Sequence, residues 1–243
     1  MEQFPIRIGT AGWGIPAPFR SAFAGPGPML ERYALQFQAV EINSSFHRCH
    51  RPGTFSKWAS LVPDGFRFAV KAPRDVTHLH RLGADANLVE FLGGIAQLGP
   101  KLGPVLLQLP PSLAFEASAV GTFLDRLRDG FDGLVVVEPR HPSWFTAEGD
   151  RLLRHFQVAR VAADPKVVPQ AGEPGGWEGL VYFRLHGSPV TYKSAYSAPF
   201  LERLASVLRG GSAPAWCIFD NTTLGEALGN GLELVSLTGR RQF

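Results

Sequence analysis

Four acidic or imidazole side chains of the sequence stand out as candidates for proton-transfer chemistry. Each follows a short apolar run, and the runs lie far apart along the chain. Carboxylates and imidazoles exchange protons with a substrate when they lie within hydrogen-bond reach of it. The candidate catalytic residues are Glu41, Glu138, His186 and Asp220.

Cationic, amide and aromatic residues occur in the same kind of position, where apolar runs end. Arginine binds carboxylates and phosphates through two parallel hydrogen bonds, and lysine supplies a point charge for the same anions. Amides could orient such a ligand, and aromatic rings could form apolar walls around it. The candidate substrate-binding residues are Trp13, Asn43, Phe46, Lys71, Arg74, Gln108, Arg140, Trp144, Arg184 and Asn221.

The apolar runs themselves predict parallel strands. They are short and mostly apolar at both odd and even positions, as in strands that are covered on both faces. We expect strands at residues 6–10, 39–43, 66–70, 105–109, 134–138, 159–163, 180–185 and 216–219.

Segments with helical periodicity alternate with these runs. Helices are expected at residues 29–37, 88–98, 120–127, 151–156, 200–208 and 226–237, the first of them with Leu30, Tyr33 and Phe37 on one stripe. Such alternation predicts an α/β fold with parallel crossovers. A (β/α)8 TIM barrel forming a single domain, residues 1–243, accounts most simply for the pattern, and an open doubly wound sheet is the alternative.

Two glycine- and proline-rich segments depart from the regular alternation. Residues 165–179, between the sixth and seventh expected strands, contain three prolines and four glycines. This composition predicts an irregular connection without a crossover helix. Residues 11–28, after the first strand, have a similar composition and could form a lid.

The alternation of side chains along a strand predicts where the charged residues point. Glu41 and Asn43 share one face of their strand, and Arg184 and His186 share one face of theirs. A charged group directed at the helix layer would be buried without a partner, at a cost of several kcal/mol or more. We therefore expect the charged residues to meet inside the carboxyl end of the barrel, where active sites of this fold lie.

Composition and charge limit the range of functions. The formal net charge is +3, and no run of basic residues suggests contact with a nucleic-acid backbone, so nucleic acid is disfavoured as a partner. No segment has the ~20 apolar residues of a membrane span, and the first eight residues carry no signal-peptide pattern. Two separated cysteines form no disulfide framework, which favours a cytoplasmic protein.

Several strings in order along the chain resemble the DUF72 (YecE-like) family. They are IGTAGW at residues 8–13, VEINSSF at 40–46, FAVKAPR at 68–74, LQLPPS at 107–112, EPRHPSWF at 138–145, RLHG at 184–187 and FDN at 219–221. The resemblance implies a TIM barrel of undefined biochemical activity. Two departures are visible, because His47 stands where the family usually has tyrosine, and Pro139 where it usually has phenylalanine.

Three functional hypotheses follow. The first is an enzyme that performs acid/base chemistry on a small anionic substrate, without a metal or other cofactor. The second is a barrel that depends on a divalent metal such as Mg²⁺ or Mn²⁺, held by Glu138, Asp164, His186 and Asp220. The third is a barrel without catalytic activity that binds a ligand or nucleic acid. The residues do not name a substrate, a reaction or an oligomeric state.

Overall fold

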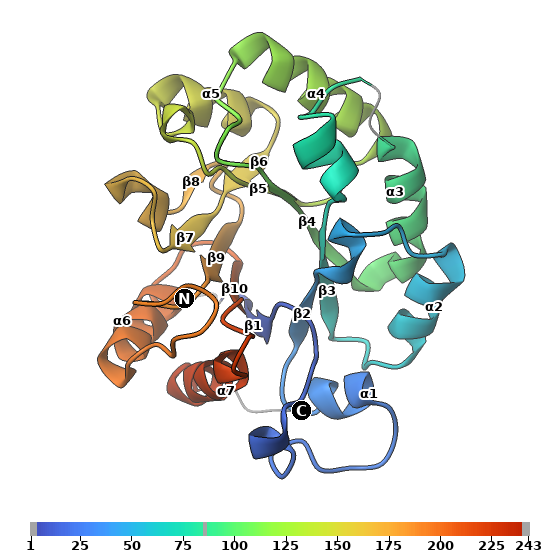
Figure 1. Cartoon of the computed structure of the whole chain (residues 1–243), viewed down its shortest axis with the longest axis vertical. Helices are drawn as coiled ribbons and strands as arrows, with labels where there is room; N and C mark the ends of the chain where they lie inside the picture. Colours follow the sequence, from blue (N-terminus) through green and yellow to red (C-terminus); the bar gives the residue numbers. More distant parts are fainter. Residues whose placement is uncertain (1–3, 85–86, 240–243) are drawn as a thin grey trace.

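The computed structural model describes residues 4–84 and 87–239, with the strands inside and the helices around them (Figure 1). The strands are β1 (Ile6–Thr10), β2 (Ala39–Ile42), β3 (Arg67–Lys71), β4 (Leu102–Gln108), β5 (Val135–Glu138), β6 (Val158–Arg160), β7 (Ala162–Asp164), β8 (Gly175–Gly176), β9 (Val181–Leu185) and β10 (Ala215–Phe219). The α-helices are α1 (Met29–Ala34), α2 (Pro52–Ser60), α3 (Leu88–Ile95), α4 (Ala117–Gly130), α5 (Ala147–His155), α6 (Ala198–Arg209) and α7 (Glu226–Leu237). Short 3-10 helices lie at Ala17–Phe19, Ser44–Phe46, Ala96–Lys101, Pro142–Trp144 and Pro169–Gly172, and a π-helix lies at Asp75–Leu79.

The strands form two sheets, which confirms the predicted α/β fold with parallel strands. One sheet has the order β1-β10-β9-β7 and the other the order β2-β3-β4-β5-β6-β8. All neighbours are parallel except β6 and β8. The hydrogen-bonded ladder is thus divided between two sheets, whereas the sequence predicted one continuous closed ladder.

Between β1 and β2, the hydroxyl of a tyrosine bridges the two strands where a regular ladder of backbone hydrogen bonds is interrupted. The hydroxyl of Tyr33 accepts from Thr10 N at 2.8 Å and donates to Ala39 O at 3.0 Å. Gly9 allows this close approach, because a Cβ there would lie 2.1 Å from Ala39 O. The two sheets meet beyond these residues in an isolated bridge between Ala11 and Glu41.

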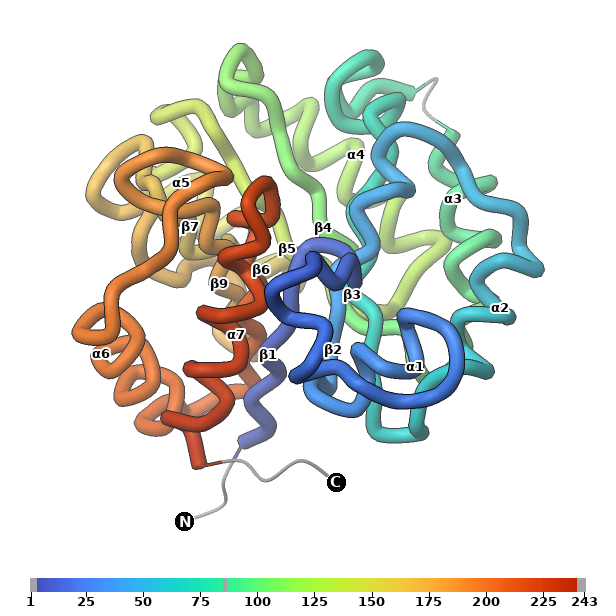
Figure 2. Tube along the Cα trace, turned by 60° about the horizontal axis from the view of Figure 1, so that its bottom comes forward, coloured from blue at the N-terminus to red at the C-terminus, as the bar shows by residue number. Residues whose placement is uncertain are grey.

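On the other side, the predicted strand at residues 159–163 is divided at Val161 into β6 and β7. The first part pairs with β5 and the second with β9. Val161 N still donates to Val137 O at 2.9 Å, so the chain passes directly from one sheet to the other. Figure 2 shows β1 beside both β2 and α7, so the first and last elements of the chain are neighbours.

Strand parity separates two apolar layers. Val135, Val137 and Leu185 pack in the outer layer with the helices. Val136 and Tyr182 belong to an inner layer between the sheets. Glu138 and Arg184 have the parity of this inner layer, so the structure directs them inward as the alternation predicts.

Local differences from the expected elements have local causes. The α2 helix was not predicted because only Phe55 among its residues is buried, which leaves no apolar stripe in the sequence. The α1 helix ends at Ala34 rather than at residue 37. Residues 165–179 contain one 3-10 helix and the two-residue β8 but no α-helix, as predicted. Among the described residues, no helix is both long and apolar enough to cross a membrane.

The close approach of β1 to β2 can be tested with Gly9→Ala. The added methyl group would collide with the backbone of Ala39, so we expect the free energy of unfolding to fall by about 2–3 kcal/mol. Gly121→Ala, at a position in α4 where a Cβ meets no atom within 4 Å, is the matched control and should be neutral or stabilising by up to about 1 kcal/mol. Urea unfolding measures both, and equal stability of the two variants would contradict this packing.

Candidate functional site

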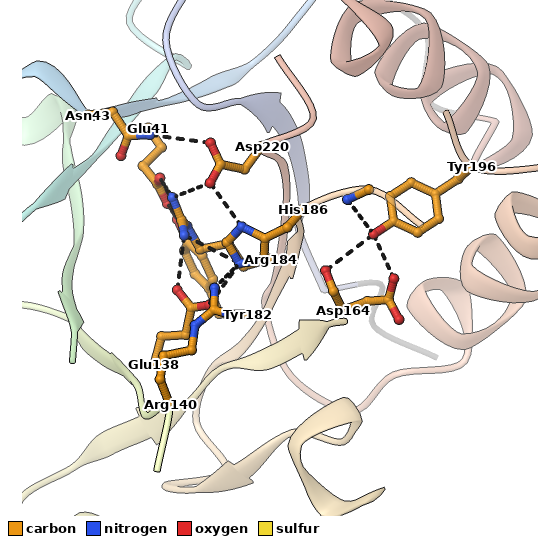
Figure 3. A network of polar contacts seen from close by, with 11 residues as sticks. Glu41, Asn43, Glu138, Arg140, Asp164, Tyr182, Arg184, His186, Tyr196 and Asp220 are labelled. Atoms are coloured by element: carbon orange, nitrogen blue, oxygen red, sulfur yellow. Dashed lines mark hydrogen bonds and ion pairs between the residues drawn. The ribbon is translucent and has the colours of Figure 1, made fainter. Parts of the chain in front are cut away.

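Arg184 on β9 is the centre of a buried ionic cluster at the carboxyl ends of the strands (Figure 3). Its Nη2 lies 2.8 Å from Glu41 Oε1 and 3.0 Å from Asp220 Oδ2, and its Nη1 lies 3.0 Å from Glu138 Oε2. Arg184, Glu41 and Glu138 are fully buried, and Asp220 is 7% exposed. One guanidinium therefore connects carboxyl groups from β2, β5 and the end of β10.

Glu41 is held from two sides. Arg184 donates to it through Nε and Nη2, and the hydroxyl of Tyr182 donates to its Oε2 at 2.8 Å. Burial and the neighbouring Glu41 raise the pKa of Tyr182 well above its ordinary value, so this phenol remains a donor. Sequence reasoning missed Tyr182, although it lies two residues before Arg184 and therefore shares its face of the strand.

His186 lies where two carboxyl groups and a second guanidinium meet. Its Nδ1 is 3.0 Å from Asp220 Oδ2, and its Nε2 is 2.8 Å from Glu138 Oε1 and 2.6 Å from Arg140 Nη2. A carboxylate accepts hydrogen bonds, whereas a guanidinium only donates them. With a hydrogen on Nε2, His186 donates to Glu138, and without one it accepts from Arg140. Either tautomer of the ring thus has a hydrogen-bond partner at Nε2.

Charge pairing offsets the burial of the acidic groups. Burial raises the pKa of Glu138, but Arg184, His186 and Arg140 outweigh it and hold the pKa well below the ordinary value. Burial likewise raises the pKa of Asp220, and Arg184 and the hydrogen bond from His186 lower it overall. Both side chains are therefore negatively charged near neutral pH.

Lys71, the last residue of β3, borders the cluster without joining its hydrogen bonds. Its Nζ lies 4.1 Å from the centroid of the Phe46 ring, and in the part of the chain that the structure describes it has no hydrogen-bond acceptor. Burial, and after it the charge of Arg184, lowers the pKa of Lys71 from 10.5 to about 8, against the opposing effect of Glu41 and the other carboxylates. The residue as a whole is 9% exposed.

Partly buried residues line the same side of the cluster. Asn43 Nδ2 lies 3.4 Å from Asp220 Oδ1 (Figure 3), and Gln108 ends β4 opposite Glu138. Asn43 Oδ1 and Arg140 Nε are buried and have no hydrogen-bond partner among the described residues. Together with Lys71 they leave one acceptor and two donors without a partner among the described residues.

Tyr192 is a second residue that sequence reasoning missed. It lies in the loop after β9, where its ring meets the ring of His186 edge-on at a centroid distance of 5.5 Å. Burial, and then the charge of Asp220, raises its pKa. No periodic signal could have found it, because its position depends on loop geometry, including a positive φ of 67° at Tyr192 itself.

Two predicted aromatic walls lie away from the cluster. Trp144 is 1% exposed and packs in the outer apolar layer, where its Nε1 donates to Leu113 O at 2.9 Å. Trp13 meets Trp58 edge-on at 5.0 Å and lines a different groove, between α1 and α2. These placements correct the expectation that both rings enclose the same ligand as the charged residues.

Two predicted polar ligand contacts are also absent from the cluster. Arg74 is exposed and begins the π-helix that follows β3. Asn221 is fully buried, and its Nδ2 donates to Ser194 O at 2.9 Å and to Asn230 Oδ1 at 3.0 Å. Asn221 Nδ2 therefore fixes the loop after β9 to α7, while its Oδ1 is buried without a hydrogen-bond partner among the described residues.

Of the four residues of the metal hypothesis, Glu138, His186 and Asp220 are brought together and Asp164 is not. Asp164 is separated from the cluster (Figure 3) and accepts a hydrogen bond of 2.8 Å from the hydroxyl of Tyr196. Strand parity is the reason, since Asp164 shares the face of Ala162, which packs in the outer layer. Within residues 4–84 and 87–239, no group of three or more histidine, cysteine or acidic residues is placed to hold a metal ion.

Comparison with known proteins identifies the family of this α/β protein. The family model described as "Protein of unknown function DUF72" matches residues 7–242, and the chain belongs to this family. The UPF0759 protein YecE of Escherichia coli K12 is 34% identical over 174 residues, which cover 68% of this chain and 61% of YecE. The match thus spans about three fifths of that curated relative.

Solved structures show the same fold. A DUF72 family protein from Enterococcus faecalis V583 superposes with a TM-score of 0.78 at 18% identity, covering 97% of this chain and 96% of its own. A DUF72 family protein from Thermotoga maritima MSB8 gives 0.76 at 24% identity, covering 97% of this chain and 100% of its own.

Replacing the central guanidinium tests whether the cluster holds the fold together. Arg184→Met would leave buried carboxylates without their shared cation, so we expect a loss of about 3–5 kcal/mol in the free energy of unfolding. Arg154→Met removes an ion pair whose side chains are 50% and 89% exposed, and should cost less than about 1 kcal/mol. Urea unfolding at neutral pH compares them, and similar losses in both variants would contradict a central role for Arg184.

The lowered pKa values of Glu138 and Asp220 predict a loss of stability in acid. Both groups bind protons more weakly in the folded protein, so their stabilisation is complete above their ordinary values of 4.5 and 3.8. It is lost as the pH falls through the lower values of the folded state. The measurement is the free energy of unfolding from pH 7 down to pH ~2.

Glu138→Gln should have a shallower pH dependence in the acid range than the unmodified protein, because one of the two groups is gone. Glu178→Gln, at a side chain that is 89% exposed, should keep the original slope. Parallel curves for the unmodified protein and Glu138→Gln would show that Glu138 does not have this role.

Proposed function

We propose that the protein is an enzyme that binds a small carboxylate- or phosphate-bearing molecule at the Lys71 side of the cluster and transfers a proton within it. The supporting observation is the position of His186. Its ring contacts Glu138, Asp220 and Arg140 at 2.6–3.0 Å. Lys71, which pairs with no carboxylate of the described residues, lies near enough to Asp220 for each charge to affect the pKa of the other group. Such a site can hold an anion and exchange a proton with it.

The anion would lie between Lys71 and Arg140. Arg140 is committed to Glu138 through Nη2, at 2.6 Å, and its Nε has no partner. The ammonium of Lys71 supplies a second donor, and Asn43 Oδ1 could accept a hydrogen bond from a substrate hydroxyl. Because the surroundings are largely buried, these interactions are stronger than they would be in water.

The other charged residues would position the proton carrier. Asp220 orients the His186 ring through Nδ1. At Nε2 the ring donates to Glu138 when that nitrogen carries a hydrogen, and accepts from Arg140 when it does not. Arg184 is engaged by Glu41, Glu138 and Asp220, and we assign it to holding these groups in place. This revises the expectation that Arg184 binds the substrate.

In this proposal the two sheets are parts of one (β/α)8 barrel in a single domain, residues 1–243. The bridge between Ala11 and Glu41 joins the sheets at one side, and the passage from β6 to β7 through Val161 joins them at the other. The cluster then occupies the carboxyl end of the barrel, where active sites of this fold lie.

Anion binding tests the proposed function. Isothermal titration calorimetry with malonate or inorganic phosphate should detect binding to the unmodified protein. Lys71→Met should weaken it at least about tenfold, equivalent to about 1.4 kcal/mol. Its thermal unfolding should change little, because Lys71 makes no hydrogen bond through Nζ to a described residue.

Lys57→Met, at an exposed lysine on α2, is the matched control and should bind as the unmodified protein does. If neither anion binds, or if Lys71→Met binds both with undiminished affinity, the cluster is a structural ion network and the proposed function is wrong.

A further inference from the structure

Lys71 is placed as a reactive amine, because it forms no ion pair with a carboxylate of the described residues. Arg184, the cation whose charge lowers the pKa of Lys71, is bound to three carboxyl groups. His78 contacts the Phe46 ring at a centroid distance of 5.0 Å, and the charge of Lys71 lowers the pKa of His78. The ammonium of Lys71 instead lies over the face of the Phe46 ring. Cation–π contact holds the group in place without supplying a hydrogen-bond acceptor.

Lys101, a partly buried lysine, shows what a structural role looks like in the same chain. Lys71, taken as a whole residue, is 9% exposed. The side chain of Lys101 is 13% exposed. Its Nζ donates to Ala59 O at 2.9 Å and to Val62 O at 2.6 Å, and it pairs with Asp64. The ammonium of Lys101 thus has hydrogen-bond acceptors, whereas the ammonium of Lys71 has none in the described part of the chain.

The surroundings of Lys71 increase the fraction of its side chain that is a neutral amine. Burial and Arg184 lower its pKa to about 8. At pH 7 roughly a tenth of the molecules then carry a free amine, compared with well under a thousandth for an ordinary lysine. A neutral amine is the nucleophilic form of the side chain.

We propose that Lys71 forms an imine with the carbonyl carbon of an anionic aldehyde or ketone. This inference rests on the proposed function for its anion site and adds the substrate class. The carboxylate or phosphate of the substrate would bind Arg140, which borders the same cluster. The carbonyl group would then face Nζ of Lys71.

The step balances without an added oxidant or reductant. Nζ loses a proton and its lone pair forms a bond to the carbonyl carbon, while the carbonyl oxygen takes up a proton. The resulting carbinolamine loses its oxygen as water and leaves a protonated imine. Overall, the lysine ammonium and the carbonyl compound give the iminium and one water. Asp220, whose charge acts on Lys71, and His186, which contacts Asp220 at 3.0 Å, would accept and return these protons.

Reductive trapping tests the imine. The full chain is incubated with glyoxylate, a small anionic aldehyde, and sodium cyanoborohydride, and the modified peptides are identified by mass spectrometry. Lys71 should be modified at least ten times faster than Lys57, Lys101, Lys166 and Lys193. Lys71→Arg keeps the positive charge and should lose only this fast modification, with circular dichroism verifying its fold. If Lys71 reacts no faster than the exposed lysines, the imine proposal is wrong.

Two further arms separate this inference from the proposed function. If malonate binds but glyoxylate does not modify Lys71 rapidly, the anion site stands and the imine is overturned. If Lys71 reacts rapidly with both glyoxylate and neutral propanal, and malonate slows neither reaction, the nucleophile is supported and the anion site is overturned. Rapid modification by glyoxylate alone, slowed by malonate, supports both.

Discussion

The structure depends on the burial of one guanidinium among carboxyl groups from three other segments. Arg184 is fully buried, and the charge of its side chain can be accommodated there only because Glu41, Glu138 and Asp220 lie within 3.0 Å of it. Removing any one partner would leave an unbalanced charge at low dielectric. The carboxyl ends of β2, β5, β9 and β10 are thereby fixed relative to one another, although they lie far apart in the sequence.

In this arrangement most of the cluster is a structural support for His186, and the reactive groups border it on one side. Buried ion pairs often add little net stability, since desolvation opposes their attraction. Their effect here is orientation: Asp220 and Glu138 are held by Arg184 and in turn hold the ring of His186. Lys71, Asn43 and Arg140 border the held groups and retain unused hydrogen-bonding capacity.

Much of this could be predicted from the sequence, because strand alternation is a strict geometric rule. The positions of the principal strands and the inward direction of Glu138 and Arg184 follow from it, and the same rule applied consistently would have found Tyr182 and excluded Asp164. Loop residues are different. Trp144 turns into the outer layer within a 3-10 helix, and Tyr192 reaches His186 through the loop after β9. Neither position follows from a periodic pattern. Nor does the division of the ladder, where the hydroxyl of Tyr33 lies between β1 and β2 and the chain changes sheets at Val161.

The most direct measurement of the central interaction is nitrogen-15 NMR of the arginine side chains. A guanidinium held by three carboxylates cannot rotate freely about its Cζ–N bonds, and its hydrogens are sheltered from water. The account predicts separate, slowly exchanging Nη signals for Arg184, assigned by their loss in Arg184→Lys. A single averaged Nη signal with rapid hydrogen exchange, like that of an exposed arginine, would contradict it.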